Sequence, residues 1–286
     1  MKRETLDNKI KISNDIMFYI YTNIDTNINM DELAQSYGVS KFYMHKIFKE
    51  IFGRNIYESI KSIRLQKASN LLLINKYSTI SEVAQACGYS SQTSFIRSFK
   101  ERFVMTPKVW RNGGYLEYSN KILKQSGEKG VYDLVPKIVK MPALDAYYIR
   151  HNGYDESIKR TWQKIQTWIY TNDLKNYEEI GLFHDNPTVT SLKECQYVAC
   201  IIDKDNGILK SDRLPKFKIA GGVYAKFELS GEEGDLLRFI QWLYHEWLPR
   251  NGYETTTKPP YAVYRKNKYL SDDKKFELDF YLSIKF

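Results

Sequence analysis

The sequence predicts a multidomain chain: an all-α N-terminal domain with two helix-turn-helix motifs joined by a linker helix, then an α+β C-terminal domain of duplicated β-α-β-β units. Three observations predict this. The 286 residues are enough to enclose two sizeable cores. Residues 31–50 and 80–103 carry similar patterns of helix, glycine turn and helix. After residue 136 the apolar spacing follows the order strand, helix, strand, strand twice.

A short amphipathic helix is expected around residues 13–23, and the first helix-turn-helix motif follows it. Gly38 permits the left-handed turn that ends the first helix of the motif. Ser40 can cap the second helix by accepting from its free backbone N–H groups. The expected core face of that second helix consists of Met44, Ile47, Phe48 and Ile51.

The second motif repeats this plan. Gly88 occupies the turn position, and Ser90 or Ser91 can cap the helix that follows. The inward face of the motif is expected to contain Val83, Ala84, Cys87, Phe95, Phe99 and Phe103. The outward face of the second helix then carries amide, hydroxyl and guanidinium groups, which suit the major groove of DNA, where Gln pairs with adenine and Arg with guanine.

Residues 56–74, between the two motifs, lack Gly and Pro and follow a helical period. A helix of that length spans about 28 Å, a little less than the roughly 34 Å of one turn of B-DNA. One chain could therefore place two recognition helices in successive major grooves.

The positive charge is concentrated in the first part of the chain. Residues 1–125 hold 19 Lys and Arg against 11 Asp and Glu, a net charge of +8, whereas residues 126–286 hold 24 against 23, a net charge of +1. This asymmetry indicates that only the first domain meets a polyanion. There is no apolar run long enough for a membrane span and no apolar leader, and the three cysteines fit a reducing cytoplasm.

Residues 9–112 resemble the DNA-binding domain of the AraC/XylS family of bacterial transcription regulators. The resemblance is carried by Ala34, Gly38 and Ser40, by Ala84 and Gly88, by the run IRLQKASNLL, and by GYSSQTSFIRSFKERFVMTPKVWR at residues 88–111. Many members have Gly near Val104, before the Thr-Pro pair. The resemblance implies binding of double-stranded DNA by both recognition helices, usually with more specificity in the first.

The DNA-binding candidates come from both motifs: Ser40, Lys41, Phe42, His45, Lys46 and Lys49, then Ser91, Gln92, Thr93, Ser94, Arg97 and Lys100. For Phe42 the alternative to a thymine methyl or sugar contact is packing on a neighbouring helix. His45 is as compatible with a phosphate contact as with a base contact. Phosphate contacts or solvated charges fit Lys49, Lys61, Lys100 and Arg102 better than base reading does.

Residues 113–136, rich in glycine, are expected to form a linker with a short helix around residues 116–123. The domain at 137–286 follows. Its expected strands and helices lie at 143–149, 156–171, 179–183, 196–202, 222–229, 235–248, 261–264 and 276–284. Two strand-helix-strand-strand units would pair about a pseudo-twofold axis and leave a groove between them.

This second half resembles the gyrase-inhibitor-like effector-binding domain through IGLFHDNP, GGVYAKFELSG, WLPRNGYETTTKPPYAVY and DFYLSIKF. The resemblance implies a groove for a small, aromatic or lipophilic, often cationic molecule, because aromatic faces attract cations. The ligand-binding candidates are Tyr147, Trp162, Tyr224, Phe227, Trp247, Tyr261, Tyr264 and Tyr281. Many relatives have Glu where this chain has Ala262. Glu246, Glu277 and Asp279 are possible substitutes for that carboxylate.

The expected function is a sequence-specific transcription regulator, by family default an activator that contacts RNA polymerase in the bacterial cytoplasm, associated with the nucleoid. We expect no cofactor, no metal, no membrane partner and no catalytic residue, since neither metal-ligand spacing nor a phosphate-binding glycine loop is present. Two alternatives for the C-terminal domain stay open. The first is that this domain is a protein-interaction module. The second is that it is a hydrolase of reactive small molecules, although Ala262 argues against hydrolysis.

Overall fold

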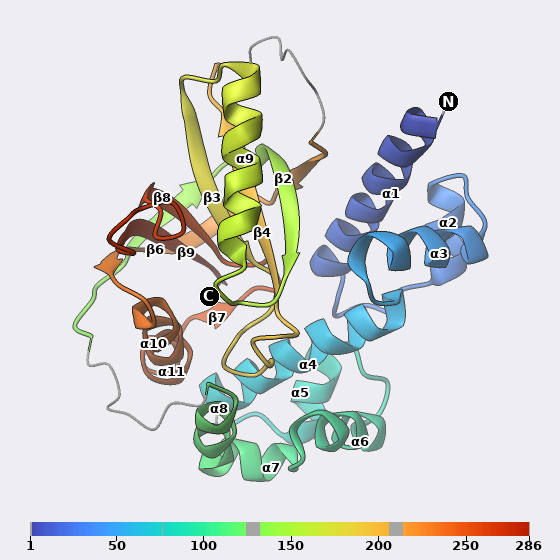
Figure 1. The fold of residues 1–286 in the computed structure, drawn as a ribbon. Coiled ribbons are helices and arrows are strands. Elements are labelled where there is room, and N and C mark those ends of the chain that lie inside the picture. Colours follow the sequence, from blue (N-terminus) through green and yellow to red (C-terminus); the bar gives the residue numbers. More distant parts are fainter. Residues whose placement is uncertain (1, 76, 124–131, 206–213, 286) are drawn as a thin grey trace. The chain divides into compact units, whose positions relative to one another are not determined.

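The computed structural model describes residues 2–75, 77–123, 132–205 and 214–285, which form two compact units, 1–115 and 116–286. The first unit is helical (Figure 1). Its helices are α1 (Lys2–Thr22), α2 (Met30–Ser36), α3 (Lys41–Phe52), α4 (Ile56–Ile74), α5 (Ile80–Ala86), α6 (Gln92–Phe103) and α7 (Pro107–Val109). The expected first helix, 13–23, was too short. Residues 2–11 are mostly polar and give no amphipathic signal, yet they contain no Gly or Pro to interrupt α1.

Local capping groups set where these helices begin. The hydroxyl oxygens of Ser40 and Ser91 accept from the backbone N–H groups of Tyr43 and Ser94, so Ser91 and not Ser90 caps α6. Helices α4 and α5 begin with reciprocal capping boxes, formed by Asn55 with Glu58 at α4 and by Thr79 with Glu82 at α5. Gly38 and Gly88 adopt φ values of +65° and +75°, which confirms both turn assignments.

Aromatic packing fastens the end of the second motif to α4. Phe95, Phe99 and Phe103 are fully buried, as the four-residue spacing predicts. The Trp110 indole, also fully buried, lies 4.7 Å from the Phe103 ring and donates through Nε1 to the Ser69 carbonyl of α4. Val104 ends α6 in the left-handed conformation at φ +59°, a conformation that glycine adopts without strain.

The second unit opens with α8 (Tyr115–Leu123), which lies in the segment expected to be the linker. It continues with β1 (Lys137–Met141), β2 (Leu144–Asn152), α9 (Ile158–Asn172), β3 (Tyr177–Phe183), β4 (Gln196–Asp203), β5 (Lys216–Ile219), β6 (Gly222–Gly231), α10 (Asp235–Trp242), a π-helical turn (Leu243–Trp247), α11 (Leu248–Arg250), β7 (Glu254–Thr255), β8 (Tyr261–Lys266) and β9 (Phe276–Lys285). The two expected repeats, β2-α9-β3-β4 and β6-α10-β8-β9, are confirmed. Three short strands, β1, β5 and β7, were missed.

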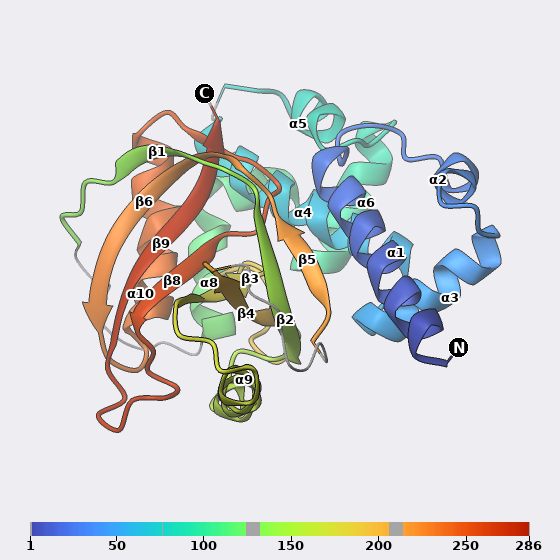
Figure 2. The same ribbon diagram turned by 90° about the horizontal axis from the view of Figure 1, so that it is seen from above.

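The strands form one curled antiparallel sheet in the order β1-β6-β9-β8-β3-β4-β2-β5, with β7 paired to β9 (Figure 2). This order is symmetric about the β8–β3 pair, which joins the repeats. Each edge strand precedes one repeat in the chain and pairs with the other repeat: β1 with β6, and β5 with β2. Each of these edge strands contains two Lys residues, in KIVKM for β1 and KFKI for β5. Lysine is typical of sheet edges, and it weakens the apolar signal of a strand.

Both long helices of this unit cover the same face of the sheet, which we call the helix face. The Trp168 ring of α9 lies 4.7 Å from Tyr147 of β2, and the Phe239 ring of α10 lies 5.3 Å from Phe227 of β6. Since side chains alternate along a strand, the strand register assigns every other residue to the opposite face, which we call the second face.

Candidate nucleic-acid interface and ligand face

The predicted reading residues of α3 lie on its solvent side. The Phe42 side chain is 80% exposed, which excludes the alternative that it packs on a neighbouring helix. Lys46 and Lys49 are also exposed, and His45 is half-buried. Lys41 forms an ion pair with Asp31 of α2, with 3.0 Å between Nζ and Oδ2. The structure thus brings these side chains together on α3.

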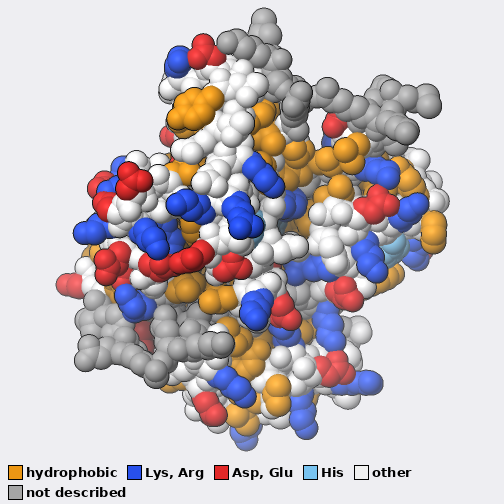
Figure 3. All heavy atoms as spheres, in the orientation of Figure 1, with side chains coloured by type: hydrophobic (Ala, Val, Ile, Leu, Met, Phe, Trp, Pro, Cys, Tyr) orange, Lys and Arg blue, Asp and Glu red, His pale blue; other side chains and the backbone are white. Residues whose placement is uncertain are grey.

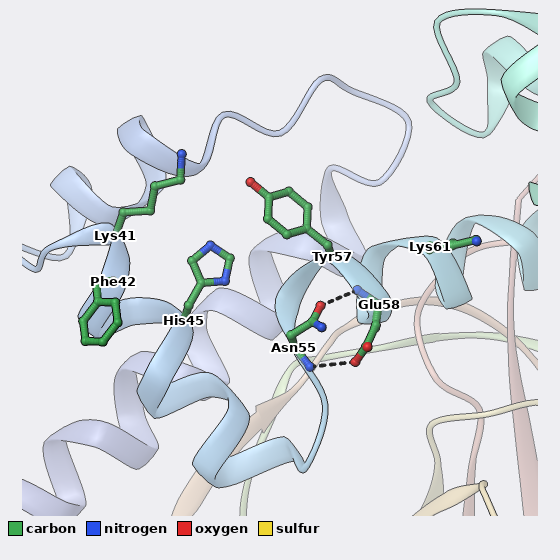
Figure 4. Close-up of a pocket in the computed structure, with 7 residues that line it drawn as sticks. All are labelled: Lys41, Phe42, His45, Asn55, Tyr57, Glu58 and Lys61. Atoms are coloured by element: carbon green, nitrogen blue, oxygen red, sulfur yellow. Dashed lines mark hydrogen bonds between the residues drawn. The ribbon is translucent and has the colours of Figure 1, made fainter.

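A hollow of about 710 Å³ lies beside this surface, lined by Lys41, Phe42, His45, Asn55, Tyr57, Glu58 and Lys61 (Figure 4). Its walls come from the first turns of α3 and of α4. His45 and Tyr57 point toward one another, and their rings stack with 5.3 Å between centroids and 25° between planes. Tyr57 was missed as a site residue, because a helical period does not show that the start of α4 lies beside α3.

The outward residues of α6 form the second predicted reading surface. Gln92, Thr93 and Ser94 are exposed in its first turn. Arg97 is 83% exposed, and its Nε lies 3.1 Å from Oε1 of Glu101, one turn later. The other carboxylate oxygen of Glu101 accepts from Nζ of Lys61 on α4, at 2.7 Å. These bonds to Lys61 and Arg97 lower the pKa of the Glu101 carboxyl.

Arg64, in the middle of α4, ties the two motifs together. Its Nε donates to the Ile24 carbonyl at 3.1 Å, and its Nη2 donates to the Thr26 carbonyl at 2.7 Å. Both carbonyls lie in the loop between α1 and α2. The same guanidinium lies over the ring of Tyr89, which directly follows the turn at Gly88. The spacing of the two motifs therefore rests on the half-buried Arg64 side chain as well as on the length of α4.

One face of the molecule carries side chains of both charges. In Figure 3, Lys and Arg side chains are interspersed with Asp and Glu side chains on the face shown. Among the described residues, no helix is long and apolar enough to span a bilayer, and no three His, Cys, Asp or Glu side chains are placed to hold a metal ion.

The eight predicted ligand residues divide between the two faces of the sheet. Tyr147, Trp162, Phe227, Trp247 and Tyr264 lie on the helix face, whereas Tyr224, Tyr261 and Tyr281 lie on the second face. All eight are buried. Residues on opposite faces cannot line one groove, so the structure brings together two aromatic groups and not one.

The helix-face group centres on a chain of buried hydroxyl and indole groups. Trp162 Nε1 donates to Tyr197 Oη at 3.1 Å, and Tyr197 Oη lies 3.2 Å from Tyr264 Oη. Burial holds the pKa of the Tyr197 hydroxyl well above its usual range, so this phenol stays neutral. Tyr197 was missed because its strand is apolar almost throughout and gives no face assignment.

Ala262 and Gly181, paired across β8 and β3, leave the centre of this face without a carboxylate. Glu179, two residues before Gly181 on the same face, supplies one nearby. Its pKa is raised by burial, and its Oε2 accepts from Asn267 Nδ2 at 2.8 Å. The substitutes considered from sequence do not reach this face: Glu277 and Asp279 lie on the second face, and Glu246 is paired with Arg250.

On the second face, the Tyr261 and Tyr281 rings stack at 4.7 Å and 11°, with Tyr224 packed against both. Asp279 forms ion pairs there with Lys226, at 2.7 Å, and with Arg265. The Asp279 carboxylate is therefore compensated by two cations of this face.

One cluster resembles a hydrolase triad in composition but not in geometry. Ser157 Oγ lies 3.1 Å from Nε2 of His151, but it also donates to Asp155. The other ring nitrogen, Nδ1, faces Thr161 Oγ1 at 3.1 Å. A triad requires the carboxylate on the nitrogen away from the serine. Here the carboxylate is on the serine, where it competes with the histidine for the hydroxyl proton.

Comparison with known proteins agrees with this organisation. The family model described as GyrI-like small molecule binding domain matches residues 135–285, more than half of the chain, and a helix-turn-helix domain model matches residues 33–113. The chain belongs to the AraC-type regulators that carry a GyrI-like domain. It thus joins a DNA-binding helix-turn-helix unit to a small-molecule-binding domain, as in ligand-responsive transcription regulators.

Three curated relatives each match about a third of this chain. The Transposon Tn10 TetD protein of Escherichia coli is 35% identical over 97 residues, which are 34% of this chain and 70% of TetD. The probable transcription factor PqrA of Proteus vulgaris is 34% identical over 105 residues, 36% of this chain and 85% of PqrA. The xylose operon regulatory protein of Escherichia coli K12 is 35% identical over 96 residues, 34% of this chain but only 24% of that protein.

Proposed function

We propose that this chain is a transcription activator that binds double-stranded promoter DNA with α3 and α6 and responds to a small molecule bound on the helix face of its GyrI-like domain. One observation carries the DNA-binding part: two capped helices with exposed polar faces are held apart by α4 and by the half-buried Arg64. Lys46, Lys49 and Lys100 would supply phosphate contacts, and Gln92, Thr93, Ser94 and Arg97 base contacts.

Activation would require contact with RNA polymerase on DNA of the bacterial nucleoid. Run-off transcription from a template carrying the selected binding site tests this part. We expect more transcript in the presence of the full chain. Less transcript at saturating occupancy would instead make the chain a repressor.

Replacing Arg97 with alanine is expected to cost about 1–3 kcal/mol of binding free energy on the selected site and to relax selectivity at one base pair. The guanidinium is exposed and oriented by Glu101. Mobility-shift titrations on specific and random duplexes measure this. Lys100→Ala is the matched control on the same helix, and it should weaken both complexes alike. Equal losses from Arg97→Ala on both duplexes would contradict base reading.

For the ligand, we propose an aromatic or lipophilic cation beside Glu179. Trp162, Tyr197 and Tyr264 place buried aromatic rings on this face, and Glu179 is a partly desolvated carboxylate that a cation would compensate.

The substitution Glu179→Gln is expected to affect the stability of the domain and its affinity for a cation in opposite directions. Because burial raises the pKa of Glu179, its ionised form costs stability above the folded pKa, and this cost fades as pH falls toward the unfolded value of 4.5. The variant should therefore melt higher at pH 7–8, with a difference that shrinks toward pH 4, since glutamine keeps an acceptor for Asn267.

The same variant should bind benzyltrimethylammonium about three- to tenfold more weakly, a loss typical of a partly buried ion pair. Thermal shift and calorimetry with this cation, against its neutral isostere neopentylbenzene, measure both effects. Unchanged discrimination between the two compounds would exclude Glu179 from the site.

A further inference from the structure

The hollow between α3 and α4 is lined by predicted reading residues of α3 and also by Tyr57, which is not one of them. Two of its aromatic side chains are far more exposed than folding requires: Phe42 is 80% exposed and Tyr57 56%. In Figure 4, Phe42 extends from the first turn of α3, Tyr57 faces His45, and Lys61 points away from the other six. Large aromatic groups on a surface otherwise rich in charge mark a contact site.

The charged groups around the hollow already have partners within the chain. Lys41 is paired with Asp31 at 3.0 Å and Lys61 with Glu101 at 2.7 Å. Asn55 and Glu58 are engaged in the capping box of α4, and its two hydrogen bonds measure 2.8 and 3.1 Å. What remains available for contact is mainly aromatic carbon and the imidazole edge of His45. Such a surface fits an apolar group better than a phosphate.

The His45 ring is held in a defined plane by its stack on Tyr57. Burial, with a smaller contribution from Lys41, lowers the pKa of His45, so the imidazole is neutral at pH 7 and keeps one N–H donor. A donor beside aromatic carbon matches thymine, which shows an O4 acceptor and a 5-methyl group in the major groove. No other base presents a methyl group there.

We propose that Phe42, His45 and Tyr57 form an aromatic wall that receives the 5-methyl group of one thymine in the half-site read by α3. Tyr57 acts as a positioning residue that orients His45 toward O4 of the same base. This inference rests on the proposed DNA-binding function. It assigns Phe42 to a thymine methyl contact in place of a sugar contact, and it adds Tyr57, a residue from outside both predicted recognition helices.

The test is a thymine-to-deoxyuridine scan of a binding site selected from random duplexes with the full chain. The exchange removes one methyl group and leaves O4 in place. We expect one position in the α3 half-site to lose about fourfold in affinity, the worth of one buried methyl group, while other thymines change little.

Three variants test whether the affinity loss at that thymine depends on Phe42 and Tyr57. In Phe42→Ala and in Tyr57→Ala the penalty at that position should vanish, and in Tyr57→Phe it should persist, because phenylalanine keeps the stack. Both side chains are exposed, so these variants should fold like the parent chain.

A scan in which no thymine is sensitive, on DNA that the chain still binds specifically, would overturn this inference and leave the proposed function intact. A sensitive thymine whose penalty is unchanged in Tyr57→Ala would also overturn it. Failure to select any binding site would instead count against the proposed function itself.

Discussion

Replacing Gly88 with alanine is expected to lower the free energy of unfolding of the helical unit by about 2–5 kcal/mol. Gly88 has a φ of +75°, where a side chain costs about 1–2 kcal/mol. A Cβ atom there would also lie 2.6 Å from the Ile24 carbonyl oxygen and 2.7 Å from Nη2 of Arg64. The carbonyl belongs to the backbone, so the loop between α1 and α2 must move, and overpacking of this kind costs about 1–3 kcal/mol more.

Gly38 is the matched control, because it occupies the same turn position in the first motif. Its φ of +65° is similar, but a Cβ atom there would meet nothing within 4 Å. Gly38→Ala should therefore show the backbone cost alone, about 1–2 kcal/mol. Hydrogen exchange in the full chain measures both variants, in α5 and α6 for Gly88→Ala and in α2 and α3 for Gly38→Ala. Equal loss of protection in the two would show that the contact with Ile24 and Arg64 is unimportant.

Gly88→Ala should also weaken specific DNA binding more than Gly38→Ala does. The displaced Arg64 guanidinium holds both the loop between α1 and α2 and the turn of the second motif. Its movement would change the spacing of α3 and α6.

Replacing Trp162 with alanine is expected to destabilise the second unit by about 3–5 kcal/mol and to abolish the thermal shift caused by benzyltrimethylammonium. The side chain is fully buried. Its removal creates a cavity under α9 and deprives Tyr197 of the indole donor. Denaturant unfolding of the full chain, followed through the remaining tryptophans, gives the stability difference.

Two further variants make this result interpretable. Trp162→Phe keeps most of the ring contact with Tyr264 but loses the N–H donor, so it should cost about 1–2 kcal/mol. Tyr170→Ala removes an exposed ring from the same helix and should change stability by less than about 0.5 kcal/mol. A ligand-induced shift that survived in Trp162→Ala would place the ligand elsewhere, with the second-face tyrosines as the next site to examine.

Where the predictions from sequence were confirmed, the signal was local. Gly38, Gly88, Ser40 and the spacing of Phe95, Phe99 and Phe103 each act within a few residues of chain, through backbone conformation, capping and helical period. The order strand, helix, strand, strand was likewise visible twice, because each segment carries its own periodicity. These features identified both motifs and the duplicated domain.

The tertiary structure alone decided which of these side chains meet. The division of the aromatic residues between two faces depends on strand register, and the placement of β1 and β5 depends on pairing with the opposite repeat. The approach of Tyr57 to His45, of Glu101 to Lys61 and of Glu179 to Asn267 joins residues about 12 to 90 positions apart. The sequence by itself determined the helices, the strands and their repetition, because these follow from local interactions. Which residues come together in each site was decided only by tertiary packing, because contacts between distant segments produce no periodic pattern in the sequence.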